Sequence, residues 1–250
     1  MTPDMTHSIN SDKEQKPKAL DRGFLHCLAN LYETYGPLGW WPADTDWEMM
    51  AGAILTQNTA WTNVEMALTN LKEAAGASRF TAGWLLEQNP EEIKAWIRPS
   101  GFFNQKTPRL FALAHWFVSH GEDTQRLHSM PLDDLRSELL AIKGVGPETC
   151  DSIVLYAAQK PVFLIDAYTR RLLLRLGYEV PRGYESLRAN LEQLVKDARP
   201  YEDNEVNLGT SSELCWLQEA HALIVEHCKN NCRKKPLCSN CSSLSCQARI

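Results

Sequence analysis

The sequence predicts an all-α protein, and two observations carry that prediction. Apolar residues recur at the i, i+3, i+4, i+7 spacing of one helix face in four stretches, which are 50–57, 132–140, 150–157 and 217–224. The single strand-like run, Val162 to Ile165, has no second run with which it could pair. Helices therefore account for the whole predicted fold.

Composition excludes several classes of protein. A hydrophobic content of 44% and a charged content of 23% over 250 residues are ordinary for a globular chain and exclude global disorder. The apolar runs fall short of the roughly 18 residues that cross a membrane, and the polar first 18 residues lack a signal peptide's apolar run. We therefore expect a cytoplasmic protein without membrane contact, and a flexible tail over residues 1–19. The net charge of −5 gives no global argument for nucleic-acid binding, although a local basic patch could provide it.

Residues 143–149 (KGVGPET) lie between two predicted helices and form the first candidate site. Gly144 and Gly146 permit a tight turn with unobstructed N–H groups, and Pro147 suits the first turn of the next helix. N–H groups and a helix dipole that converge in this way can hold a phosphate. A purely structural corner between two helices is the alternative interpretation.

Asp166 follows the apolar run and precedes another helical stripe, so it suits a helix N-cap. A helix N-terminus also favours the ionised form of a carboxylate. Such a carboxylate can stabilise an oxocarbenium-like sugar and orient an attacking water, as in glycoside hydrolysis. The two roles are compatible.

Six of the eight cysteines lie in the last 36 residues, and the final four suit a metal site. Cys232, Cys238, Cys241 and Cys246 fall within 15 residues, with basic residues between them. Four thiolates can hold zinc or a cubane iron–sulfur cluster, and spacing alone does not separate the two. Cys228 is a competing first ligand. The sequence further predicts that Cys27, Cys150 and Cys215 are buried in helical stripes.

Taken together, these motifs resemble those of the endonuclease III-like HhH-GPD DNA glycosylases. Residues 143–149, the Pro161 loop and Asp166 are similar to the family's helix-hairpin-helix, Gly/Pro-rich loop and aspartate, and the resemblance covers about residues 24–246. Residues 54–59 (ILTQNT) are similar to a helix end of the family that bears a glutamine, and residues 101–106 (GFFNQK) are similar to a further family loop.

The resemblance implies a two-lobed helical fold acting on double-stranded DNA that contains a damaged base. One lobe would span 43–172, and 20–42 plus 173–250 would form the second, with a [4Fe–4S] loop at 232–246. The protein would be a monomer, associated with the nucleoid if its source is a prokaryote. The cluster ligands would be Cys232, Cys238, Cys241 and Cys246, with structural zinc as the alternative. The first and last gaps of this loop are each one residue shorter than the commonest family spacing.

The resemblance also implies roles for single residues. Asp166 would be catalytic, and Gln57 would fill the space that a flipped base leaves. The hairpin would bind DNA through a set of five residues, which are Lys143, Gly144, Val145, Gly146 and Thr149. In bifunctional members a lysine stands where this chain has Glu148 and forms a Schiff base with the sugar. Glu148, which we also place among the catalytic residues, has no amine, so we expect hydrolysis by water with weak or absent abasic-site (AP) lyase activity.

The segment Trp40-Trp41-Pro42 resembles the base-contacting segment of the family's 3-methyladenine glycosylase branch. Indole faces attract cations, and an alkylated purine is cationic and departs easily. The resemblance therefore implies an alkylated purine as the substrate, although a tryptophan pair that only packs is the plainer interpretation of these residues. Two alternative functions stay open, a bifunctional glycosylase and AP lyase acting on oxidised pyrimidines and a non-catalytic DNA-binding module.

Overall fold

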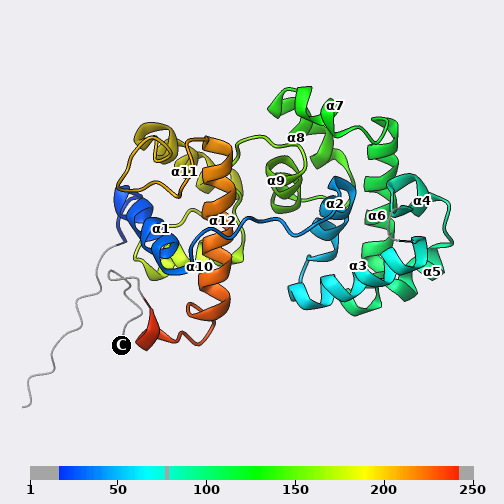
Figure 1. Cartoon of the computed structure of the whole chain (residues 1–250), viewed down its shortest axis with the longest axis horizontal. Coiled ribbons are helices and arrows are strands. Elements are labelled where there is room, and N and C mark those ends of the chain that lie inside the picture. Colours follow the sequence, from blue (N-terminus) through cyan, green and yellow to red (C-terminus); the bar gives the residue numbers. More distant parts are fainter. Residues whose placement is uncertain (1–16, 77–78, 242–250) are drawn as a thin grey trace, which may run out of the picture.

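The computed structural model describes residues 17–76 and 79–241, and within them the regular structure is helical (Figure 1). The all-α prediction is confirmed, with a lone β-bridge between Lys18 and Tyr178 as the exception in the described residues. Two groups of helices lie side by side in Figure 1. The larger holds α2 (Asp46–Leu55), α3 (Trp61–Ala75), α4 (Ala82–Leu86), α5 (Pro90–Trp96), η2 (Arg98–Ser100), α6 (Phe103–Ser119), α7 (Thr124–Ser129), α8 (Leu132–Ala141) and α9 (Pro147–Tyr156). The smaller holds α1 (Arg22–Tyr35), α10 (Ala167–Arg175), α11 (Tyr184–Ala198), α12 (Glu213–Asn230) and η3 (Cys238–Asn240).

The contacts between helices bear on where one lobe ends and the other begins. α10 packs on α12, so the boundary expected at residue 172 falls inside a helix of the smaller lobe, and we infer that the division lies before α10. Lys18 exchanges backbone hydrogen bonds with Gly177 and Glu179 and so belongs to this lobe, not to the expected tail. The rest of that tail, residues 1–16, lies outside the described residues. No helix in the described part of the chain is long and apolar enough to cross a membrane.

The run Val162 to Ile165 is extended and buried, yet it is not part of a sheet. Buried backbone N–H groups need partners, and here side chains of α11 supply them. Phe163 N donates to Glu192 Oε1 (3.1 Å) and Ile165 N donates to Tyr184 Oη (3.3 Å). The run therefore enters the core without a partner strand and delivers Asp166 to the start of α10.

A buried ion-pair network joins α8 and α9 to α11. Arg136 Nε donates to Asp151 Oδ1 (2.7 Å), and Arg136 Nη2 donates to Glu185 Oε1 (2.9 Å). Tyr184 Oη donates to Asp151 Oδ2 (2.8 Å). Asp151 is fully buried, so its charge depends on these partners.

We predict that Asp151→Asn lowers the free energy of unfolding by about 3 kcal/mol, because the buried Arg136 keeps only the half-exposed Glu185 as a carboxylate partner. Urea denaturation followed by circular dichroism measures this change. The matched control is Glu185→Gln, whose side chain is 53% exposed and whose loss costs at most about 1 kcal/mol. Equal losses in the two variants would contradict a buried network.

Candidate functional site

The hairpin between α8 and α9 presents unpaired backbone N–H groups at the start of α9. The N–H groups of Gly144 and Gly146 have no hydrogen-bond partner among residues 17–76 and 79–241. Val145 N donates to Ile142 O (3.0 Å) and its side chain is buried, so Val145 anchors the turn. Lys143 is exposed beside it. Pro147 occupies the first turn of α9, as the sequence predicts.

Gln57, just beyond the end of α2, is tied to this hairpin. Its Nε2 donates to Gly144 O (3.0 Å) and to Thr149 Oγ1 (3.0 Å). Its Oε1 accepts a hydrogen bond from Arg109 of α6. Gly144 has a φ of +98°, and a Cβ at that position would lie 2.3 Å from Arg109 Cγ. The glycine is therefore required both by the turn and by the close approach of Arg109.

Arg109 was not among the residues singled out from the sequence. It lies three residues beyond the 101–106 motif, which gave the one available signal. In the same motif Lys106 is fully buried and donates through Nζ to Leu55 O (2.8 Å) and Ser100 O (2.7 Å). Burial, followed by the charge of Arg109, lowers the pKa of Lys106 to about 8. Residues 103–106 of this motif, which the resemblance placed in a loop, form the first turn of α6, and these bonds fasten that turn to the end of α2 beside Gln57.

Asp166 is the N-cap of α10, as its position in the sequence predicts. Its Oδ1 accepts from Thr169 N (2.7 Å) and Thr169 Oγ1 (2.8 Å), and the side chain is 11% exposed. His221 Nε2 of α12 lies 3.8 Å from Asp166 Oδ2. Burial acts to raise the pKa of Asp166, but the interactions with His221 and Thr169 outweigh it and bring the pKa below its usual range.

Glu148, in the first turn of α9, experiences the opposite shift. Its side chain reaches solvent, yet desolvation by surrounding protein atoms, followed by the charge of Asp166, raises the pKa of Glu148 to about 7. Arg170 lowers it in part. At neutral pH Asp166 is therefore ionised, and Glu148 is the more easily protonated of the two carboxyl groups.

Aromatic rings gather beside these carboxylates. The ring centroid of Trp41 lies 6.0 Å from that of Trp40, 5.2 Å from that of Trp61 and 5.3 Å from that of Tyr156. We call these four residues the aromatic wall. Trp40 and Trp41 are half-buried, and Pro42 is exposed at the end of the segment. The tryptophan pair therefore packs against other rings while both side chains stay partly exposed.

Two members of the wall, Trp61 and Tyr156, were missed from the sequence. Trp61 begins α3 two residues after the 54–59 motif, and Tyr156 lies in the apolar stripe of α9, so neither carried a signal of its own. The segment that carries Trp40 crosses α12 between the two lobes (Figure 1). Glu219 of α12 holds it there by accepting hydrogen bonds from Leu38 N (2.7 Å) and Gly39 N (3.3 Å).

The cysteine loop follows α12. A small pocket there is lined by Leu172, Arg175, His227, Asn231, Cys232, Pro236, Cys238 and Cys241. Three of the four predicted ligands thus face one pocket, and Cys246 lies outside the described residues. Arg175 Nη1 donates to Cys232 Sγ (3.1 Å). The hydrogen bond from Cys228, together with Arg175, lowers the pKa of Cys232 to about 6.

The other cysteines in the described residues do not line that pocket. Cys228 does not line it, and its thiol lies 3.7 Å from Tyr168 O. Cys27 and Cys150 are buried as predicted, but Cys215 is exposed because the first turn of α12 lies at the surface. In the described residues no three His, Cys, Asp or Glu side chains are already arranged to hold a metal ion.

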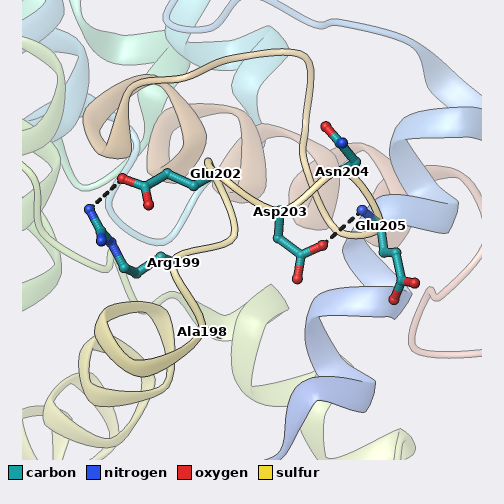
Figure 2. A pocket seen from close by; sticks show the side chains of 6 residues that line it. All are labelled: Ala198, Arg199, Glu202, Asp203, Asn204 and Glu205. Atoms are coloured by element: carbon teal, nitrogen blue, oxygen red, sulfur yellow. Dashed lines mark hydrogen bonds and ion pairs between the residues drawn. The ribbon is translucent and has the colours of Figure 1, made fainter.

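A shallow hollow after α11 contains none of the candidate residues. Figure 2 shows its lining, which consists of Ala198, Arg199, Glu202, Asp203, Asn204 and Glu205. Arg199 pairs with Glu202, and Asp203 accepts from Glu205 N (2.9 Å) and pairs with Arg22. The charges of Arg199, Glu202 and Asp203 in this hollow are therefore paired with neighbouring opposite charges.

Comparison with known proteins places this site in a family. Residues 51–197 match the model of the HhH-GPD superfamily base excision DNA repair protein. A protein of Methanocaldococcus jannaschii that is named as a DNA repair glycosylase is 41% identical over 215 residues, covering 84% of this chain and 89% of that protein. Endonuclease III of Thermotoga maritima is 26% identical over 155 residues, covering 62% of this chain and 68% of that protein.

Solved structures agree with this family. The H. pylori 3-methyladenine DNA glycosylase bound to 1,N6-ethenoadenine aligns with a TM-score of 0.71 and 30% identity, covering 84% of this chain and 98% of that one. A non-covalent endonuclease III–DNA complex shares the fold, with a TM-score of 0.68 at 18% identity, covering 89% of this chain and 92% of that one. With both family motifs and fold matched over most of its length, this chain belongs to the HhH-GPD superfamily of base excision DNA repair proteins.

Proposed function

We propose that this glycosylase-family protein hydrolyses the N-glycosidic bond of a damaged base, an alkylated purine, in double-stranded DNA. The observation that carries the proposal is the placement of Asp166. This ionised, largely buried carboxylate caps α10 and faces His221 Nε2 at 3.8 Å. It is also electrostatically coupled to Glu148 in the hairpin helix. A carboxylate in that state stabilises the positive charge that develops on the sugar as the base departs.

The hairpin would hold the DNA backbone. The unpaired N–H groups of Gly144 and Gly146, at the positive end of α9, suit a phosphate oxygen, and the exposed Lys143 adds charge. The base must leave the helix to reach the reactive groups. Gln57, fastened beside the hairpin, is the residue that would fill the vacated space.

The aromatic wall suits a flat, positively charged base. Indole faces attract cations, by up to about 2 kcal/mol where water is excluded. The likeness to the H. pylori 3-methyladenine DNA glycosylase supports the same substrate class. A base that is already cationic also departs without strong acid catalysis.

Water would be the nucleophile in this reaction. In the bifunctional enzymes of the family an amine stands at the position of Glu148, whereas a carboxyl group cannot form an imine with the sugar. We therefore infer a monofunctional enzyme with weak or absent AP lyase activity, acting as a monomer. The borohydride experiment below tests the bifunctional alternative.

The cysteine loop fits a [4Fe–4S] cluster held by Cys232, Cys238, Cys241 and Cys246. Three of these cysteines line one pocket, and the likeness to endonuclease III supports the cluster over structural zinc. When bound, the cluster cross-links the loop rather than taking part in hydrolysis. Arg171 holds the same loop by donating to Cys232 O (2.8 Å) and Cys228 O (3.2 Å).

The first prediction from the proposed function concerns base release. Incubation with methylated duplex DNA should release free methylpurine, and Asp166→Asn should slow release at least about 100-fold, as expected for loss of a charge that stabilises the transition state. Affinity for a duplex with an abasic-site analogue should persist, because asparagine still caps α10. Asp133→Asn, an exposed first-turn aspartate of α8, is the matched control. Full activity in Asp166→Asn would reject the proposed chemistry.

A second prediction concerns Glu148. DNA treated with the wild-type enzyme should break only after mild alkali, and borohydride should trap no covalent complex. Glu148→Lys restores an amine at this position and should yield a trapped enzyme–DNA complex. Trapping with the wild type would show that another amine attacks the sugar, and the bifunctional alternative would then hold.

A third prediction concerns the metal. Protein purified without oxygen should contain iron and acid-labile sulfide, and Cys232→Ala should lose most of both. Cys215→Ala, which changes an exposed cysteine outside the pocket, should keep them. Zinc without sulfide in the wild type would favour the structural-zinc alternative.

A further inference from the structure

His221 lies between the aromatic wall and Asp166, and no role has been assigned to it so far. The residue is 5% exposed and lies on α12. Its Nδ1 is 2.8 Å from Tyr156 Oη, and its Nε2 is 3.8 Å from Asp166 Oδ2. Its ring meets that of Trp40 edge to face, with centroids 5.9 Å apart. One imidazole therefore lies within hydrogen-bond distance of Tyr156 of the wall and within ion-pair distance of the carboxylate.

The hydrogen bonds of Tyr156 determine which nitrogen of His221 carries a proton. Tyr156 Oη lies 3.2 Å from Gln218 O as well as 2.8 Å from His221 Nδ1, and it has one proton to donate. If Tyr156 donates to His221 Nδ1, the neutral ring carries its proton on Nε2. If Tyr156 donates to Gln218 O, then Nδ1 must be protonated, and a lone pair on Nε2 would face an ionised carboxylate unless Nε2 is protonated too. The first arrangement directs an N–H at Asp166, and in the second only a ring protonated on both nitrogens does so.

The two oxygens of Asp166 differ in their surroundings. Oδ1 accepts both hydrogen bonds from Thr169, which belong to the helix cap. Oδ2 has no hydrogen-bond partner within 3.5 Å in the described part of the chain, and His221 Nε2 is the cationic or N–H group that faces it. Oδ2 is thus free to serve a substrate, and its charge state depends on His221.

We propose that His221 is a positioning residue for Asp166: its N–H group keeps the carboxylate ionised and directs Oδ2, while Tyr156 holds the imidazole in place. This inference rests on the proposed role of Asp166 in base release.

Other titratable groups around His221 do not take its place beside Asp166. α9 contributes Tyr156 and Glu148, α10 contributes Tyr168 and Arg170, and α12 contributes Glu219 and Lys229, whereas the Trp40 segment (residues 36–42) has no titratable side chain. Glu148 and Glu219 are acidic and oppose ionisation of Asp166. Arg170 donates to Pro181 O (2.7 Å) and Lys229 lies over the Trp40 ring, so these two cations have other contacts.

The test is a 13C NMR titration of the aspartate carboxyl carbons, with the Asp166 signal assigned by its loss in Asp166→Asn. In His221→Leu the pKa of Asp166 should rise by about 1 unit or more, because an opposite charge or N–H donor has been removed. His221→Gln keeps an N–H donor but no charge and should give a smaller rise. His115→Gln, an exposed histidine of α6, should give none. An unchanged Asp166 pKa in the two His221 variants would overturn the proposal, and His221→Gln decides alone if the leucine variant does not fold.

The pH profile of base release provides the second measurement. Because ionised Asp166 is the active form, the acid limb of kcat/KM should move to higher pH in His221→Leu by the amount that NMR records. Tyr156→Phe should move it less, in the same direction. A shifted NMR titration with an unmoved acid limb would also overturn the positioning role. If the wild type releases no base, the proposed function fails, whereas the NMR titration still decides whether His221 controls Asp166.

Discussion

Asp166 combines two demands that usually conflict, since it is a largely buried carboxylate that stays ionised. Burial of a charge is costly unless hydrogen bonds and opposite charge compensate for it. Thr169 satisfies one oxygen and His221 faces the other. The buried run Val162 to Ile165 reaches this point because α11 side chains take the place of a partner strand. This compensation also joins two helices of the smaller lobe, because Asp166 caps α10 and His221 lies on α12.

A second carboxyl group nearby makes the site asymmetric. Glu148 shares the field of Asp166 but has no histidine beside it, so its pKa rises to about 7 while that of Asp166 falls. Two acids whose environments separate their pKa values can take different roles at one pH. The same position explains the expected mechanism, because a carboxyl group there cannot replace the amine of the bifunctional enzymes.

The hairpin, the segment with Gln57 and the start of α6 are connected by polar contacts. Lys106 joins the start of α6 to the end of α2, and Gln57, just beyond that end, joins it to the hairpin. Arg109 crosses Gly144 so closely that no side chain fits there. A substitution in one of these loops is therefore transmitted to the others through buried polar contacts rather than through flexible chain.

The sequence by itself determined the features that depend on neighbouring residues. Helical periodicity, the glycine turn at 144–146, Pro147 at a helix start and Asp166 as an N-cap are local, since a φ angle or a cap is set within a few residues. Tertiary structure alone decided the rest. Trp61 and Tyr156 both pack against Trp41, and Tyr156 contacts His221 of α12, which lies 65 residues further along the chain; no periodicity encodes these contacts. The raised pKa of Glu148 and the exposure of Cys215 likewise follow from how whole helices pack, because burial depends on every neighbour at once.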